Sequence, residues 1–90
     1  MATAPTPRTA TALLRRPSVE RSTGLARTTI YRRIKEGIFP RPVDLGGGIV
    51  GWPAHEVEAI NQARLASKTD EEIRSLVAQL HEARTGKNGG

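Results

Sequence analysis

The sequence predicts a mainly helical domain that carries one small β-hairpin, and three observations lead to this expectation. A short basic helix over 27–36 follows a tight turn at 24–26. Two short apolar segments separated by three glycines then fill 43–52. An amphipathic helix with a capping sequence covers 69–85. Two helices joined by a tight turn and followed by a hairpin are typical of a winged helix-turn-helix, so we expect that fold with an added C-terminal helix.

Composition limits the part of the 90-residue chain that can fold to about residues 12–85. Segment 1–11 is mostly Thr, Ala and Pro, and segment 86–90 is Gly, Lys and Asn. Neither offers enough apolar surface to offset the loss of chain entropy, so we expect both to be disordered tails. Between them we expect a winged helix-turn-helix domain at 12–66 and an amphipathic helix at 67–85.

Several classes of protein conflict with this composition. The chain has no cysteine, which excludes disulfides and Cys-ligated zinc. No apolar run approaches the ~20 residues that span a bilayer, and the amino-terminus lacks the apolar core of a signal peptide. We therefore expect a cytoplasmic, nucleoid-associated protein without a membrane partner. His55 and His81 stand alone, and no Ser-His-Asp set or carboxylate pair can be assembled, so we expect no metal, no cofactor and no enzymatic activity.

Positive charge gathers in the first half of the chain. Residues 1–52 contain nine Lys or Arg and three acids, whereas residues 53–90 contain five and six. The formal net charge of +5 therefore comes from the front half. Such an asymmetry indicates one electropositive face, which is the electrostatic signature of a nucleic-acid partner. A merely solvated, Arg-rich surface is the alternative.

The first helix is bounded by Pro17, which suits an early helical position, and by Gly24, which suits a left-handed stop. Leu14 and Val19 supply its apolar contacts. The second helix begins after Ala26, where a Ser or Thr cap is usual. We expect this missing cap to cost ~1 kcal/mol of helix stability.

The basic helix at 27–36 is the candidate recognition helix. Ile30 and Ile34 lie four residues apart and define its buried stripe. The opposite face is expected to read base edges in the major groove of double-stranded DNA, where Arg can form two hydrogen bonds to guanine. That face carries Thr28, Arg32 and Lys35. The flanks and the helix start are expected to contact phosphates, and these positions are Arg27, Thr29, Tyr31 and Arg33.

The wing is predicted at 43–52, after an extended Phe39–Pro42 stretch in which the prolines restrict the backbone. Its turn consists of Gly46, Gly47 and Gly48, because glycine supplies the positive φ that a hairpin turn needs. Trp52 is expected to anchor the wing in the core. We expect the turn to lie along the DNA backbone beside the recognition helix.

The third helix is expected to run from about Pro53 to about Ala66, with Val57 and Ile60 facing inward and Leu65 joining them. The fourth begins at a capping box, Thr69-Asp70-Glu71-Glu72. Its apolar face repeats at i, i+3, i+4 and i+7 and consists of Ile73, Leu76, Val77 and Leu80. This face either packs on the winged domain or forms a homodimer contact, which would let two copies engage two half-sites.

Residues 13–66 resemble the AlpA family of small phage and prophage regulators, relatives of MerR-type winged helix-turn-helix domains and of phage excisionases. The motifs that carry the resemblance are Leu14-Arg15 before Pro17, Thr23-Gly24-Leu25, Arg27 to Arg32, Ile34 to Gly37, Phe39 to Val43, Leu45-Gly46, Gly51-Trp52 and Glu56 to Ala59. The resemblance implies a DNA-binding domain that controls transcription or excision of an integrated element. Three features depart from the pattern of the family that the chain resembles: Ala26 replaces a usual serine, Gly48 replaces a usual basic residue, and the helix at 69–85 lies beyond the usual end of the family module.

The leading hypothesis is a sequence-specific transcriptional regulator that binds double-stranded DNA of a phage or an integrated element. An excisionase, which would bind an attachment region and assist an integrase, uses the same module. A third alternative is a protein-interaction module that acts through the helix at 69–85. Only Tyr31 supplies an aromatic ring on the basic helix, which argues against binding single strands by base stacking.

Overall fold

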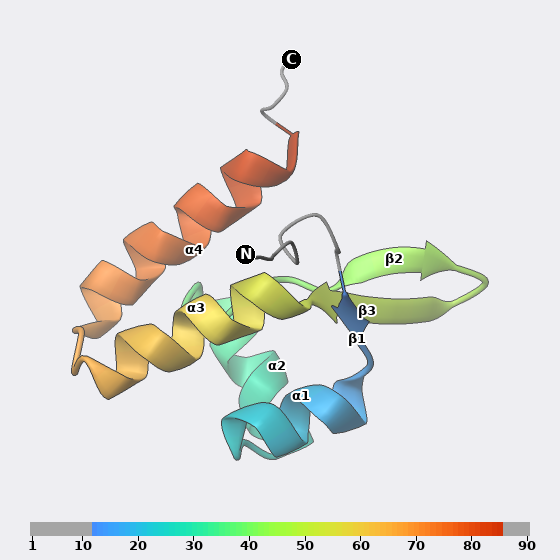
Figure 1. Ribbon diagram of the computed structural model, residues 1–90, viewed down its shortest axis with the longest axis horizontal. Coiled ribbons are helices and arrows are strands. Elements are labelled where there is room, and N and C mark those ends of the chain that lie inside the picture. The colour runs from blue at the N-terminus through green and yellow to red at the C-terminus, as the bar shows by residue number, and fades with distance from the viewer. Residues whose placement is uncertain (1–11, 86–90) are drawn as a thin grey trace, which may run out of the picture.

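The computed structural model describes residues 12–85 and confirms the predicted fold class (Figure 1). The expectations for the tails 1–11 and 86–90 lie outside the described residues. The elements, in chain order, are β1 (Leu13–Leu14), α1 (Arg16–Thr23), α2 (Arg27–Glu36), β2 (Val43–Gly46), β3 (Ile49–Pro53), α3 (Ala54–Leu65) and α4 (Asp70–Thr85). Helix α3 contacts both α1 and α4, and the hairpin of β2 and β3 projects from the end of the molecule where β1 meets β3 (Figure 1).

The turn between α1 and α2 is held by local hydrogen bonds. Gly24 takes the left-handed conformation, with φ of 74°, and its N–H donates to the Glu20 carbonyl at 2.8 Å. The Thr23 hydroxyl accepts the Leu25 N–H at 3.2 Å and donates to a carbonyl one turn earlier. Ala26 occupies the N-cap of α2 without a side-chain hydrogen bond. The tight connection and the missing cap therefore both agree with the expectation from sequence.

The sheet has three antiparallel strands in the order β1-β3-β2, one more than the sequence predicted. Strand β1 pairs Leu13 with Pro53 and Leu14 with Trp52. The Ala54 N–H extends this ladder by donating to the Ala12 carbonyl at 2.8 Å. A strand of two residues is too short to show the period-2 alternation by which strands are recognised, which is why it was missed.

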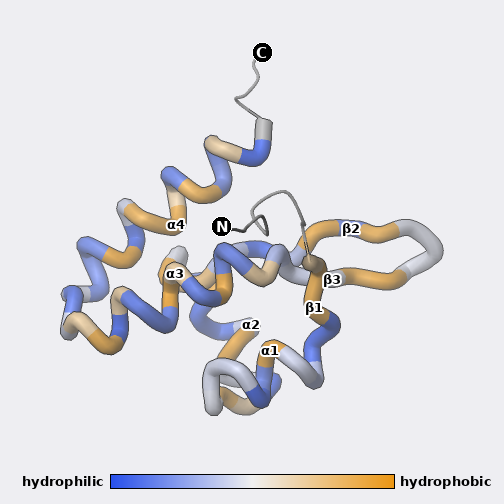
Figure 2. The backbone as a smooth tube through the Cα atoms, viewed as in Figure 1, coloured by the Kyte–Doolittle hydropathy of each residue, from blue (hydrophilic) through white to orange (hydrophobic). Residues whose placement is uncertain are grey.

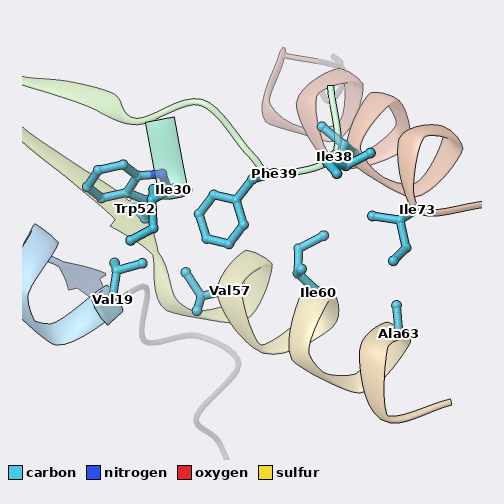
Figure 3. Close-up of a cluster of buried hydrophobic side chains, with 10 residues drawn as sticks. Val19, Ile30, Ile38, Phe39, Trp52, Val57, Ile60, Ala63 and Ile73 are labelled. Carbon is cyan, nitrogen blue, oxygen red and sulfur yellow. The ribbon is translucent and has the colours of Figure 1, made fainter. Parts of the chain in front are cut away.

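One hydrophobic core joins the helices, the connection after α2 and strand β3. Phe39 lies in the middle of the labelled side chains in Figure 3, and Ile73 reaches in from α4 toward Ile38 and Ala63. Trp52 is fully buried, as expected of a core anchor. The buried apolar residues are Val19, Ile30, Ile38, Phe39, Trp52, Val57, Ile60, Ala63, Ile73 and Val77.

Helix α3 faces the core with Val57, Ile60 and Ala63, but the expected burial of Leu65 is wrong. Leu65 is 79% exposed. A helix turns by about 100° per residue, so Leu65 lies roughly 200° around the axis from Ala63 and faces solvent. Glu56, which is charged, is buried on the inner face of α3.

Helix α4 begins with the predicted capping box. The Thr69 N–H donates to Glu72 Oε1 at 2.9 Å, and the Glu72 N–H donates to the Thr69 hydroxyl at 3.1 Å. The backbone hydrogen bond from Thr69 lowers the pKa of Glu72. Hydrophobic and hydrophilic residues alternate along the helix (Figure 2). Ile73 and Val77 are buried in the core of the same chain, and Leu76 and Leu80 pack against it partly buried.

Candidate nucleic-acid interface

Helix α2 places the three candidate base-reading residues on its exposed side. Thr28, Arg32 and Lys35 are all exposed. Ile30 on the opposite side is fully buried, and Ile34 is partly buried. The helix carries four cations and a single acid, Glu36, so its outer surface is strongly positive. An α-helix with a positive outer face fits the major groove of DNA.

Arg32 is free to leave its intramolecular partner. Its Nε lies 3.8 Å from Glu36 Oε2, and the two side chains are 62% and 48% exposed. A long ion pair of this kind in water contributes between ~0 and 1 kcal/mol. The guanidinium can therefore exchange Glu36 for a guanine or a phosphate at little cost.

The candidate phosphate-contacting residues differ in exposure. Arg27 and Tyr31 are exposed, whereas Thr29 and Arg33, four residues apart, are partly buried along one edge of the helix. The Tyr31 ring meets Trp52 edge to face, with centroids 6.2 Å apart. Since Trp52 belongs to β3, this contact ties the helix surface to the base of the wing.

The wing ends in a glycine turn with a bare backbone. Gly46, Gly47 and Gly48 have φ of 95°, 62° and 79°, and no atom would meet a Cβ there within 4 Å. The tip is pale between two hydrophobic strands in Figure 2. Leu45 and Ile49 beside it are 39% and 42% exposed. The wing from 43 to 53 contains no basic side chain, so any contact with phosphate there must come from backbone N–H groups.

A hollow between the wing and the start of α1 adds to the candidate interface two arginines that the sequence analysis did not single out. It is lined by Arg15, Arg16 and Pro17 on one side and by residues 48–50 on the other. Arg15 is exposed, whereas the Arg16 Nε is paired with Glu20 at 2.9 Å. The basic count of the front half contained this signal, but only the folded hairpin brings these arginines next to the wing.

The connection between α2 and β2 was expected only to be extended, and the structure also buries it. Ile38, Phe39 and Pro40 are buried. The Trp52 indole N–H donates to the Pro40 carbonyl at 2.9 Å. The connection therefore packs against the wing strand and fixes how the wing stands relative to α2.

Within residues 12–85 no helix is long and apolar enough to cross a membrane. Over the same residues, no three His, Cys, Asp or Glu side chains gather as metal ligands would. His55 is exposed, while both ring nitrogens of His81 lie within hydrogen-bond distance of Arg41.

Residues 12–65 match the family described as Prophage CP4-57 regulatory protein (AlpA), and this match covers more than half of the 90 residues. The chain belongs to the AlpA family. AlpA proteins are phage regulators that bind DNA, so the resemblance seen in the sequence is confirmed. The family match ends before α4 (Asp70–Thr85).

The chain is also similar to a phage protein over part of its length. It is 46% identical over 55 residues to "Uncharacterized protein ORF88" of Enterobacteria phage P4. The matched segment is 61% of this chain and 62% of that protein, less than two thirds of the relative's length.

Proposed function

We propose that this AlpA-family chain is a sequence-specific transcriptional regulator that binds double-stranded DNA of a phage or an integrated element. Helix α2 enters the major groove, and Thr28, Arg32 and Lys35 contact base edges. The observation that carries the proposal is the exposure of these three residues on one strongly positive helix face.

The neighbouring residues fix the register of the helix on the duplex. Arg27 and Tyr31 are exposed beside the base-reading face, and Thr29 and Arg33 reach phosphates from one edge of the helix. The glycine turn of the wing approaches the adjacent backbone without side chains. Contacts of this kind position a protein on DNA but do not read its sequence.

Removing the positive face tests the proposal. The double substitution Arg32→Ala and Lys35→Ala should lower affinity for the operator duplex by at least ~10-fold, because one bidentate base contact discriminates by about 1–3 kcal/mol. Fluorescence anisotropy with labelled duplex, against scrambled duplex of equal length, measures this loss.

A control variant separates the helix face from net charge. Arg64→Ala with Lys68→Ala removes the same charge from the end of α3 and the turn after it. It should leave the ratio of specific to non-specific affinity unchanged. Equal losses in the two variants would mean that charge alone binds DNA, and full affinity in the first would refute the assignment of α2.

An excisionase remains the second candidate, because it would use the same module at an attachment region together with an integrase. Footprinting separates the two functions. One protected operator near a promoter is expected of a regulator, and several adjacent sites in an attachment region are expected of an excisionase. The third alternative is a protein-interaction module that acts through α4, but two of the four apolar residues of that face, Ile73 and Val77, are buried in the core of the chain itself.

A further inference from the structure

Side chains of helix α4 form hydrogen bonds to both ends of the connection between the candidate recognition helix α2 and the wing. At the first end, Arg74 Nε donates to the Glu36 carbonyl at 3.2 Å. At the second, Arg84 Nη2 donates to the Arg41 carbonyl at 2.7 Å, and His81 Nε2 accepts the Arg41 N–H at 3.0 Å. Glu36 is the last residue of α2, and Arg41 lies two residues before β2.

The Arg74 contact falls where a helix has unmet hydrogen-bonding capacity. The last four carbonyls of a helix lack partners within it, and their dipoles attract a cation. The Arg74 side chain also covers Gly37, where a Cβ would lie 3.5 Å from its Cγ. Arg74 also forms an ion pair with Glu71, in which Nη1 lies 2.8 Å from Glu71 Oε1. The guanidinium therefore lies over the end of α2.

The Arg84 contact rests on a buried anchor. Its guanidinium forms two hydrogen bonds to the buried Glu56 of α3, at 2.6 and 2.9 Å. The Arg41 carbonyl thus bonds to a group that cannot move without exposing or unpairing Glu56. Because Ile38 packs into the core beside Ile73, the middle of the connection is fixed as well.

We propose that α4, which lies beyond the residues of the family match, sets the position of α2 relative to the wing, with Arg74 as the positioning residue for the end of α2. This inference rests on the proposed DNA-binding function. It assigns α4 a role in sequence recognition without DNA contact: Arg74 holds the last turn of α2, which carries Lys35.

The test compares the full chain with its Arg74→Ala variant on operator and scrambled duplexes at several salt concentrations. Loss of one hydrogen bond from an exposed side chain predicts a fall of about three- to tenfold in the ratio of specific to non-specific affinity. The salt dependence should stay unchanged. If Arg74 instead contacts phosphate, the slope of log affinity against log salt falls by ~0.9, and the positioning role is wrong.

Two control variants isolate the contact. Glu71→Gln removes the ion pair of Arg74 but keeps its hydrogen bond to Glu36, and should retain most of the specificity. Arg64→Ala removes the ion pair between Arg64 and Asp70 of α4. This pair does not involve the connection between α2 and β2. An effect of Arg64→Ala as large as that of Arg74→Ala would assign the loss to general destabilisation and overturn the proposal.

Hydrogen exchange tests, without DNA, whether Arg74 stabilises the end of α2. The Gly37 and Ile38 amides, which bond to carbonyls of the last turn of α2, should exchange faster in Arg74→Ala while the amides of α3 do not. If Arg74→Ala leaves the exchange of these amides unchanged, or leaves the specificity for DNA unchanged, the inference is overturned. If the wild-type chain prefers no duplex, the proposed function fails and the recognition role with it. The exchange data then decide separately whether Arg74 holds the connection.

Discussion

The ion pair between Glu56 and Arg84 is expected to be the largest single polar contribution to the attachment of α4. Glu56 is 1% exposed, and both of its oxygens accept hydrogen bonds from Arg84, at 2.9 and 2.6 Å. The substitution Arg84→Met keeps most of the aliphatic volume but leaves the carboxylate buried without its partner. Breaking a buried pair in this way costs about 3–5 kcal/mol.

The expected loss is a large part of the free energy of unfolding of the whole domain. At roughly 0.05–0.15 kcal/mol per residue, a domain of this size has about 4–11 kcal/mol in total. We expect the lower end of the range for Arg84→Met, because the 20% exposure of Arg84 admits water to the site. The variant should therefore stay folded in buffer at low temperature and unfold at much lower urea than the wild type.

A double-mutant cycle makes this prediction quantitative. Urea unfolding followed by circular dichroism gives the free energies for Arg84→Met, for Glu56→Gln and for the double variant. The double variant should lose less than the sum of the single variants, because the neutral amide no longer needs a cation. Additive losses, or a loss below about 1 kcal/mol for Arg84→Met, would refute the reasoning.

Three further predictions concern the helix cap, a histidine and the core. Ala26→Ser supplies the missing cap of α2 and should stabilise the chain by ~1 kcal/mol in urea unfolding, whereas the exposed Ala78→Ser in the interior of α4 should not. Burial, followed by the charges of Arg41 and Arg84, lowers the pKa of His81, so the unfolded chain takes up the proton first. Thermal stability should then fall as the pH drops below about 6.5; His81→Gln should reduce this fall, and His55→Gln should not. Ile73→Ala should cost about 2–5 kcal/mol if α4 packs on its own chain, and a loss that varies with protein concentration would indicate the homodimer instead.

Local signals allowed most elements to be predicted. The stop at Gly24, the glycine turn of the wing and the Thr69–Glu72 capping box each depend on a few adjacent residues, and the structure contains all three. The exposed face of α2 followed from helical spacing alone. The exposure of Leu65 could also have been derived from that spacing, because it lies about 140° around the helix from Ile60 and about 160° from Ala63.

The remaining features depend on contacts between distant parts of the chain. Arg84 lies 28 residues from Glu56 and 43 from Arg41, and no spacing rule connects them. The two-residue strand β1 forms only because β3 offers it a partner. Phe39 is buried because it joins one core cluster with residues of α3 and β3. The sequence alone could show that the connection is extended but not that Phe39 lies in the core.

The central claim is that α2 reads double-stranded DNA. The most direct measurement is fluorescence anisotropy of the wild-type chain on duplexes tiled across the region upstream of its own gene, titrated with salt. The account predicts tight binding to one tile, with log affinity falling by ~0.9 per phosphate contact against log salt. Absence of binding at low salt, or equal weak binding to every tile, would contradict it.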